Sequence, residues 1–192
     1  FPSDTFFHRI QKFTSEGAFI STWGTEGTGD GEFDSPHDVA VTSDGSVYVA
    51  DTYNHRIRKV TGTTITTVAG NGTDGFGGDT GEATSANLNM PHGIAVDASG
   101  NLYIADSANN RIRHVSASDS TITTIAGTGA SGLGGVLEGP ATEADIGDPR
   151  GIFVLPDGDL LVSESGGQVV RRINLSTGIT TGFAGSGFAG FG

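Results

Sequence analysis

Two histidines occupy matching places in the sequence and could share a ligand. His37 and His92 each follow a proline, and each opens an apolar run. Neutral imidazoles bind zinc and similar divalent metals, so these side chains are the first candidates for chemistry. Arg150 takes a third matching place, after Pro149. Because two imidazoles leave zinc short of ligands and Arg150 adds positive charge, we expect a ligand-facing cluster without a bound metal.

A glycine-rich segment, NGTDGFGGDTGE at residues 71–82, supplies a second candidate site. It carries Asp74 and Asp79, and carboxylates on such a loop could bind calcium. The spacing of the carboxylates fits no EF-hand, and the matching linker at residues 127–149 lacks these two aspartates. We therefore expect a solvated loop, with a calcium site as the alternative.

An acid and an arginine recur at a fixed spacing and could form structural ion pairs. The three pairs are Asp4 with Arg9, Asp51 with Arg56, and Asp106 with Arg111. Each acid ends one predicted strand and each arginine starts the next, so each pair should brace a short loop. We accordingly expect the loss of Arg56 to cost more stability than the loss of Arg58. Glu164 and Val169 break the pattern, which predicts a different brace there.

These residues stand on a repeated series of short strands. Three prolines open the apolar runs PHDVAV, PHGIAV and PRGIFV, and each run leads into a turn with Asp-Gly or Ser-Gly. Such turns are typical of tight β-hairpins. Two further alternating segments follow, as in HRIRKV, and then a threonine-rich one, as in TITTVAG. The pattern predicts units of four antiparallel strands.

Such units cannot bury both faces alone, so we expect them to stack radially in an all-β fold, the β-propeller. The chain holds about three and a half units, so we expect an incomplete ring that needs further blades from a longer chain or from other copies. The predicted divisions are a partial blade with the third and fourth strands and linker (1–33), three blades (34–70, 71–127 and 128–185), and the start of a further linker (186–192).

The long linkers predict which face binds a ligand. Consecutive strands run in opposite directions. The linkers between units and the loops between second and third strands therefore lie on one face. The linkers span residues 24–36, 70–91 and 127–149, and loops of this length are usually functional or mobile. We expect any binding site on this face.

The repeated segments resemble those of a known family. Residues 38–60, DVAVTSDGSVYVADTYNHRIRKV, and 93–115, GIAVDASGNLYIADSANNRIRHV, are similar to NHL repeats, with NHR and NNR in place of the Asn-His-Leu triplet that names them. The resemblance implies a propeller that serves as a binding platform and, in some members, as an enzyme. A more distant similarity links the chain to peptidyl-hydroxyglycine amidating lyases. It implies zinc at the Pro-His positions and places Tyr53 at the active site.

Composition narrows the class of partner. The chain has 22 acidic and 10 basic residues and a net charge of −12, which disfavours nucleic acid and anionic membranes. It contains no cysteine and no apolar run long enough to span a membrane. The surface rich in Ser, Thr, Gly and Asn indicates a secreted or cell-surface bacterial protein.

These observations favour a non-catalytic binding or scaffold module for a protein or a glycan, working through the long-loop face without a cofactor. The alternative is a metal-dependent lyase or hydrolase that acts at the channel mouth through His37, His92 and Tyr53.

Overall fold

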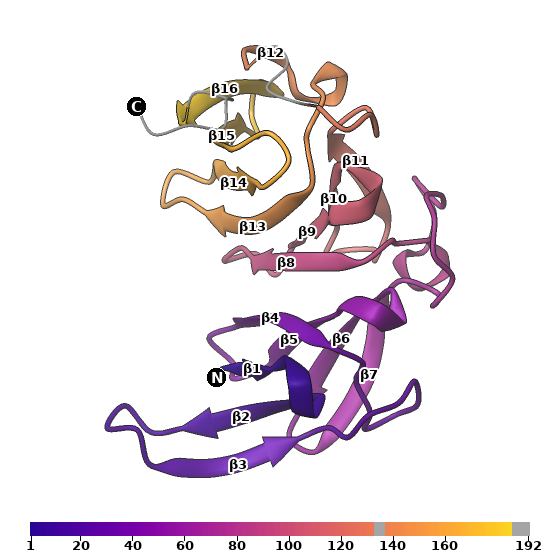
Figure 1. Ribbon diagram of the computed structural model, residues 1–192, viewed down its shortest axis with the longest axis vertical. Helices are drawn as coiled ribbons and strands as arrows, with labels where there is room; N and C mark the ends of the chain where they lie inside the picture. Colours follow the sequence, from indigo (N-terminus) through magenta and orange to yellow (C-terminus); the bar gives the residue numbers. More distant parts are fainter. Residues whose placement is uncertain (133–136, 186–192) are drawn as a thin grey trace.

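The computed structural model describes residues 1–132 and 137–185 and folds them into four antiparallel sheets (Figure 1). The first sheet contains β1 (Ser3–Asp4), β2 (Arg9–Phe13) and β3 (Phe19–Trp23); the second β4 (Pro36–Val41), β5 (Val47–Asp51), β6 (Arg56–Thr61) and β7 (Thr64–Ala69); the third β8 (Pro91–Val96), β9 (Leu102–Asp106), β10 (Arg111–Val115) and β11 (Ile122–Ala126); the fourth β12 (Gly139–Pro140), β13 (Pro149–Val154), β14 (Leu160–Glu164), β15 (Val169–Asn174) and β16 (Ile179–Ala184).

Five short 3-10 turns punctuate these strands. They are η1 (Thr5–Phe7), η2 (Thr52–Asn54), η3 (Ala83–Ser85), η4 (Ser107–Asn109) and η5 (Ala141–Glu143). In the described residues no helix has the length and apolar character that a membrane span requires.

The second and third sheets are buried on both faces. Successive side chains of their strands point alternately toward one neighbouring sheet and toward the other. In β5, Val47 and Val49 pack in the core between the first and second sheets. Tyr48 and Ala50, which alternate with them, pack in the core between the second and third sheets. A third cluster of the same kind lies between the third and fourth sheets. The hydrophobic core is therefore a series of interfaces between consecutive sheets rather than one central cluster.

The first strand of each four-stranded unit lies beside the first strand of the next. β8 contacts β4 on one side and β13 on the other, as the ribbon shows (Figure 1). β8 and β13 approach so closely that a Cβ added at Gly93 would lie 2.1 Å from the carbonyl oxygen of Arg150. This is the arrangement of β-propeller blades, and the described sheets form an arc of such blades.

Two sheets contain a strand beyond those that the repeat predicts. The first sheet includes β1, which takes the place of the second strand of a unit. It pairs with β2, and Asp4 lies opposite Arg9. The fourth sheet gains β12, in which Gly139 and Pro140 of the linker pair with the outer strand β16. The linker thus covers an edge that would otherwise offer unpaired backbone groups.

Two faces follow from this topology. The linker face carries the linkers that enter the first strands, together with η1, η2 and η4. The hairpin face, on the opposite side, carries the turns after each first strand and each third strand.

Two kinds of hydrogen bond connect consecutive sheets on the linker face, and we call them inter-sheet latches. The imidazole Nδ1 atoms of His8 and His55 accept from the amides of Ser35 (3.0 Å) and Met90 (3.2 Å). Hydroxyl groups donate to the proline carbonyls that open the next sheet: Thr5 to Pro36 (2.8 Å), Thr52 to Pro91 (2.7 Å) and Ser107 to Pro149 (2.5 Å). Each latch begins on one sheet and ends on the segment that enters the following sheet.

The structure corrects the predicted ion pairs in the second and third sheets. Asp4 and Arg9 do meet, at 2.9 Å. Asp51, however, lies 3.8 Å from Arg58 rather than pairing with Arg56. In the same way Asp106 pairs with Arg113 at 3.3 Å, not with Arg111. Each aspartate pairs with the arginine that lies deeper in the sheet, because a carboxylate removed from water needs a buried donor.

Arg56 binds the linkers instead of Asp51. It reaches out of the sheet and donates to the carbonyls of Thr28 (3.1 Å) and Asn71 (3.2 Å), which belong to the two linkers flanking its sheet. Arg111 likewise donates to Asn109 and Thr128. The fourth sheet, expected to be braced differently, uses the same deeper position: Arg171 binds Glu164 at 2.5 Å.

Candidate functional site

The linker face brings three of the predicted site residues together at the start of the first strands. The rings of His37 (β4) and His92 (β8) have centroids 4.4 Å apart. Arg150, in β13, places Nη1 3.1 Å from Nε2 of His92. His37 is exposed, whereas His92 is 9% exposed. We call these three residues the channel-mouth cluster.

The contacts of His92 fix its protonation. Nδ1 lies 3.0 Å from the carbonyl oxygen of Met90, which can only accept, so Nδ1 carries the proton. Nε2 faces the guanidinium of Arg150, which can only donate, so Nε2 is the acceptor. Burial lowers the pKa of His92, and the charge of Arg150 lowers it further. Both ring nitrogens of His92 are therefore engaged within the protein.

The surroundings of His37 favour its neutral form. Partial burial lowers the pKa of His37, and repulsion from the neighbouring His92 ring and the Arg150 guanidinium acts in the same direction. Within residues 1–132 and 137–185, no group of three or more His, Cys, Asp or Glu side chains is placed to hold a metal ion. The donor set at the channel mouth does not fit zinc, because the lone pair of one of its two imidazoles is directed at an arginine.

Two acids that the sequence pattern did not single out organise this cluster. Asp148 forms an ion pair with Arg150 at 2.9 Å and so orients the guanidinium toward His92. Asp38 accepts a hydrogen bond from the amide of Ile94 at 2.9 Å and thereby joins β4 to β8. Burial raises the pKa of Asp38. The available signal was their closeness to the repeat prolines: Asp148 directly precedes Pro149, and Asp38 follows Pro36 by two residues.

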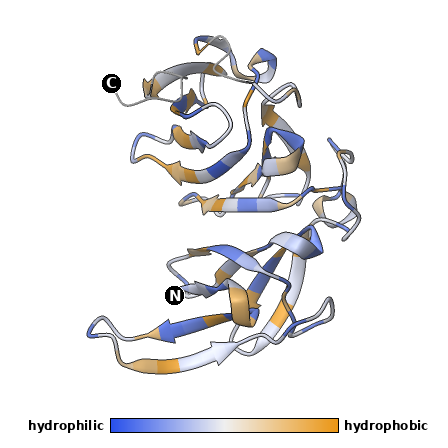
Figure 2. Cartoon of the chain, in the orientation of Figure 1, coloured by the Kyte–Doolittle hydropathy of each residue, from blue (hydrophilic) through white to orange (hydrophobic). Residues whose placement is uncertain are grey.

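Exposed aromatic rings add an apolar surface to the linker face. Phe6 is 83% exposed and Phe7 60%, and their rings meet edge to face at 5.1 Å. The guanidinium of Arg9 lies 5.0 Å from the centroid of the Phe7 ring. The turn η1 that carries both phenylalanines is strongly hydrophobic beside the polar strand β2 (Figure 2). We call Phe6 and Phe7, together with Tyr53, the aromatic patch.

Tyr53 holds in η2 the place that Phe6 holds in η1, and it is 52% exposed. Its backbone amide donates to the carbonyl of Asp34 at 3.2 Å, which fixes the turn and leaves the ring in solvent. Among residues 1–132 and 137–185, no hydrogen bond joins its hydroxyl to a histidine. Tyr53 therefore shares a face with His37 and His92 without joining their cluster.

The glycine-rich linker does not assemble a calcium site from its two aspartates. Asp79 forms an ion pair with Arg113 at 2.7 Å. Asp74 is exposed, and no contact joins it to Asp79. Between them, Phe76 stacks on the guanidinium of Arg111 with 3.8 Å from Cζ to the ring centroid. Asp79 thus helps to fix the linker onto the third sheet.

Comparisons with known proteins agree with this fold. The NHL repeat family profile matches residues 33–60 and 88–115. Suppressor of quenching 1 of Arabidopsis thaliana is 37% identical over 95 residues, which are 47% of this chain and 9% of that protein. Human NHL repeat-containing protein 2 is 33% identical over 104 residues, or 53% of this chain and 14% of the relative. The chain therefore spans only a small part of these curated relatives.

A solved structure extends the likeness to nearly the whole chain. Virginiamycin B lyase from Staphylococcus aureus superposes with a TM-score of 0.61 and 18% identity, over 94% of this chain and 50% of that protein. At this identity the likeness concerns the fold. With sheets arranged as blades and with two segments that match the family profile, this chain carries NHL repeats on a β-propeller fold.

Proposed function

We propose that this chain is a non-catalytic binding module that holds a protein partner against its linker face. The observation that carries the proposal is the aromatic patch. Phe6, Phe7 and Tyr53 leave more than half of their area in water on one face. Aromatic rings and arginines are enriched at protein interfaces, and gathered exposed apolar surface marks such sites. Arg9, stacked on Phe7, supplies the arginine.

Charge and composition support a protein partner of this kind. The net charge of −12 disfavours nucleic acid, whose phosphates require a basic surface. We further propose an extracellular or cell-surface setting, in keeping with the Ser-, Thr- and Gly-rich surface. NHL repeat-containing protein 2, which shares the repeat, takes its name from the repeat and not from a ligand or an activity.

Selection from a random peptide library on the immobilised chain tests the proposal. Enriched peptides should bind the parent protein and a Phe153→Ser control equally, because Phe153 is 60% exposed in β13, outside the patch. They should bind the Phe6→Ser/Phe7→Ser variant at least about tenfold more weakly, as expected for central aromatic anchors. Peptides that bind all three proteins alike would refute a role for the patch.

A second candidate is a lyase or hydrolase at the channel mouth. Two observations favour it: the exposed imidazole of His37 has its centroid 4.4 Å from that of His92, and the fold resembles that of virginiamycin B lyase. The Arg150 contact on His92 opposes a metal-dependent version. Elemental analysis of the purified protein decides between the two: we expect no stoichiometric zinc. Zinc that is lost in a His37→Ala/His92→Ala variant would favour the enzyme.

A further inference from the structure

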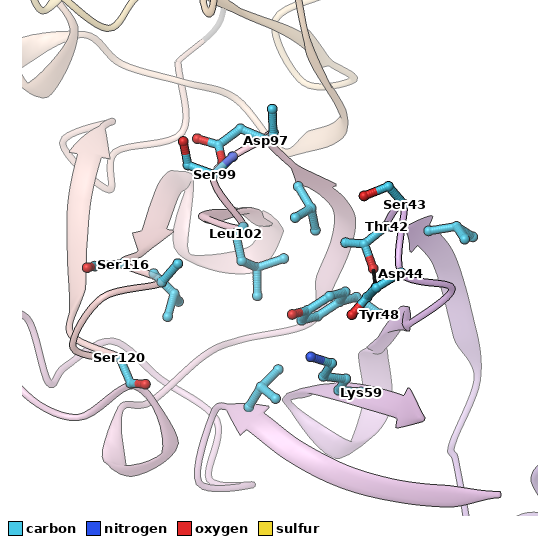
Figure 3. Close-up of a pocket in the computed structure, with 17 residues that line it drawn as sticks. Thr42, Ser43, Asp44, Tyr48, Lys59, Asp97, Ser99, Leu102, Ser116 and Ser120 are labelled. Atoms are coloured by element: carbon cyan, nitrogen blue, oxygen red, sulfur yellow. Dashed lines mark hydrogen bonds between the residues drawn. The ribbon is translucent and has the colours of Figure 1, made fainter. Parts of the chain in front are cut away.

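A cavity of about 710 Å³ opens on the hairpin face, between the second and third sheets. Its walls come from both sheets, and its rim from the turns that follow β4, β8 and β10 (Figure 3). The volume lies within the range of small-molecule sites. It faces away from the aromatic patch and from the channel-mouth cluster, so it is a separate site.

The matching interface between the third and fourth sheets carries larger side chains at two places. There Ile125 and Ile173 stand at the places that Val68 and Val115 hold in the interface with the cavity, so each valine is one methylene smaller. Tyr103, which matches Tyr48, is 4% exposed, and its hydroxyl binds Asp97 at 3.2 Å. The cavity thus lies at the interface that has the smaller side chains at these two places.

Two polar groups point into the cavity without a hydrogen-bond partner in the described part of the chain. The Tyr48 hydroxyl and the Lys59 ammonium group both turn toward its centre (Figure 3). The ammonium nitrogen lies 5.2 Å from the centroid of the Tyr48 ring. The matching base of the fourth sheet, Arg172, is instead paired with Asp157 and Asp159, each at 2.7 Å. Tyr48 and Lys59 therefore retain free hydrogen-bonding capacity over an apolar floor.

The carboxylates of the rim are occupied by their own turns. Asp44 accepts from the amide and hydroxyl of Ser46 at 3.0 and 3.1 Å and from the Thr42 hydroxyl. The Thr42 and Ser46 hydrogen bonds lower the pKa of Asp44 to about 2, and the charge of Lys59 contributes. Asp97 accepts from the amides of Ser99 and Asn101, each at 2.9 Å. Two carboxylates against one ammonium group make the cavity acidic, so a neutral ligand fits it better than an anion.

We propose that this cavity binds a neutral sugar ring. The axial C–H face of a pyranose would lie on the apolar floor of Val68, Leu102 and Val115. Ring hydroxyl oxygens would accept from Lys59 and Tyr48, and other hydroxyls would bond to the serine-rich rim formed by Ser43, Ser99, Ser116 and Ser120. A ligand with alternating hydroxyls and C–H faces satisfies both halves of the lining at once.

Backbone amide NMR of the whole chain tests the site with three probes: methyl β-glucopyranoside, cellobiose and benzoate. The first two are neutral and carry equatorial hydroxyls, while benzoate represents an apolar anion. We expect saturable shifts with the sugars, centred on Tyr48, Lys59 and Leu102, and weaker or no binding of benzoate.

Three variants locate the binding. Lys59→Met should weaken sugar binding about tenfold, by the loss of a charged donor. Lys12→Met, the matching change in the first sheet, where the ammonium group lies 5.5 Å from the Phe1 ring, should leave it unchanged. Val68→Ile/Val115→Ile should weaken sugar binding, because the added methylene groups occupy the apolar floor against which the sugar ring would pack.

Each contrary result overturns a defined part of the proposal. No saturable shift with either sugar refutes the site. Sugar binding of unchanged strength in the Val68→Ile/Val115→Ile variant places the ligand elsewhere and refutes the cavity. Tight, Lys59-dependent binding of benzoate without sugar binding refutes the ligand class. Because the aromatic patch lies on the opposite face, the Phe6→Ser/Phe7→Ser variant should bind the sugars normally, so this proposal and the protein-binding proposal can fail separately.

Discussion

The buried ion pairs act on the linkers as much as on the sheets. Asp51 accepts from the amide of Asp34 at 2.6 Å, and Arg58 donates to the carbonyl of Gly29 at 2.9 Å. One buried pair thus holds two points of the linker that enters the second sheet. Asp106 and Arg113 repeat this on the next linker, with bonds to Asn89 and Gly77. The shape of the linker face is therefore set by side chains in the sheets below it.

Replacement of Arg58 should cost far more stability than replacement of Arg56. Arg58 is 1% exposed, and its removal leaves the buried Asp51 without its cation, a change that costs about 3–5 kcal/mol in comparable cases. Arg56 binds only exposed linker carbonyls, so Arg56→Ala should cost about 1 kcal/mol. Urea unfolding at neutral pH measures both. Equal midpoints would show that Asp51 does not depend on Arg58.

The channel-mouth histidines should make stability fall on acidification. Their pKa values are lowered in the folded chain, by burial first, so the unfolded chain takes up protons before the folded chain does. Stability is thus complete above the unfolded histidine pKa of about 6.5 and declines as the pH falls below it.

The double variant His37→Asn/His92→Asn isolates this effect. The variant should lose less stability than the parent between pH 7 and pH 5 in urea unfolding. Burial raises the pKa of Asp51 and of Asp106 to about 6, which gives both proteins an opposite trend in this range that cancels in the comparison. An identical pH dependence of the two proteins would contradict the assignment.

At the scale of elements, the 3-10 turns after the second strands are the joints between sheets. Each ends on a residue in the left-handed conformation: His8, His55 and Asn110 have φ of 51°, 52° and 53°. This conformation turns the side chain toward the next linker, where the latches form. Asparagine and histidine tolerate this region better than most side chains and can also accept the amide hydrogen.

His55→Asn should be nearly neutral and His55→Ala clearly destabilising. Asn110 already performs the same task in the third sheet, where its Oδ1 accepts from the amide of Asp148 at 3.0 Å. Alanine at position 55 would keep the unfavourable φ and leave the Met90 amide without an acceptor, a loss of about 1–3 kcal/mol. Thermal and urea unfolding of the two variants measure the difference. Equal loss in both would mean that the latch is incidental.

At the scale of the whole molecule, stability rests on interfaces between sheets under a strong net charge. Three core clusters join the four sheets in sequence. The chain carries a charge of −12, and mutual repulsion of this kind opposes a compact state. Buried ion pairs are little affected by salt, whereas exposed charges are screened by it.

Salt should therefore stabilise the folded chain at neutral pH. Between about 0.02 and 0.5 M sodium chloride, the urea midpoint should rise as the Debye length shortens. The control is the same experiment near pH 4.5, the calculated isoelectric point, where the net charge is close to zero and the effect should be much smaller. A midpoint that is independent of salt at neutral pH would show that surface repulsion is already balanced locally.

The sequence predicted the sheets well because alternation and turn chemistry are local signals. Residues 47–51 alternate between two apolar faces, and Asp44-Gly45 makes the hairpin before them. The sequence did not show that Asp51 pairs with Arg58 rather than Arg56. Both arginines lie on one face of β6, and only their depth in the sheet differs. The cavity depends on Val68 and Val115 meeting across two sheets, and the state of His92 depends on the reach of Arg150. Neither relation is visible along one strand.

The direction of the inter-sheet latches has a consequence for synthesis on the ribosome. Every latch has its side-chain group on the earlier sheet and its backbone group on the segment that enters the later one. A nascent chain emerges in the same order, so each new proline segment meets hydroxyl and imidazole groups that already stand on a formed surface. We expect the blades to be laid down one after another from the N-terminal side, each serving as the template for its successor.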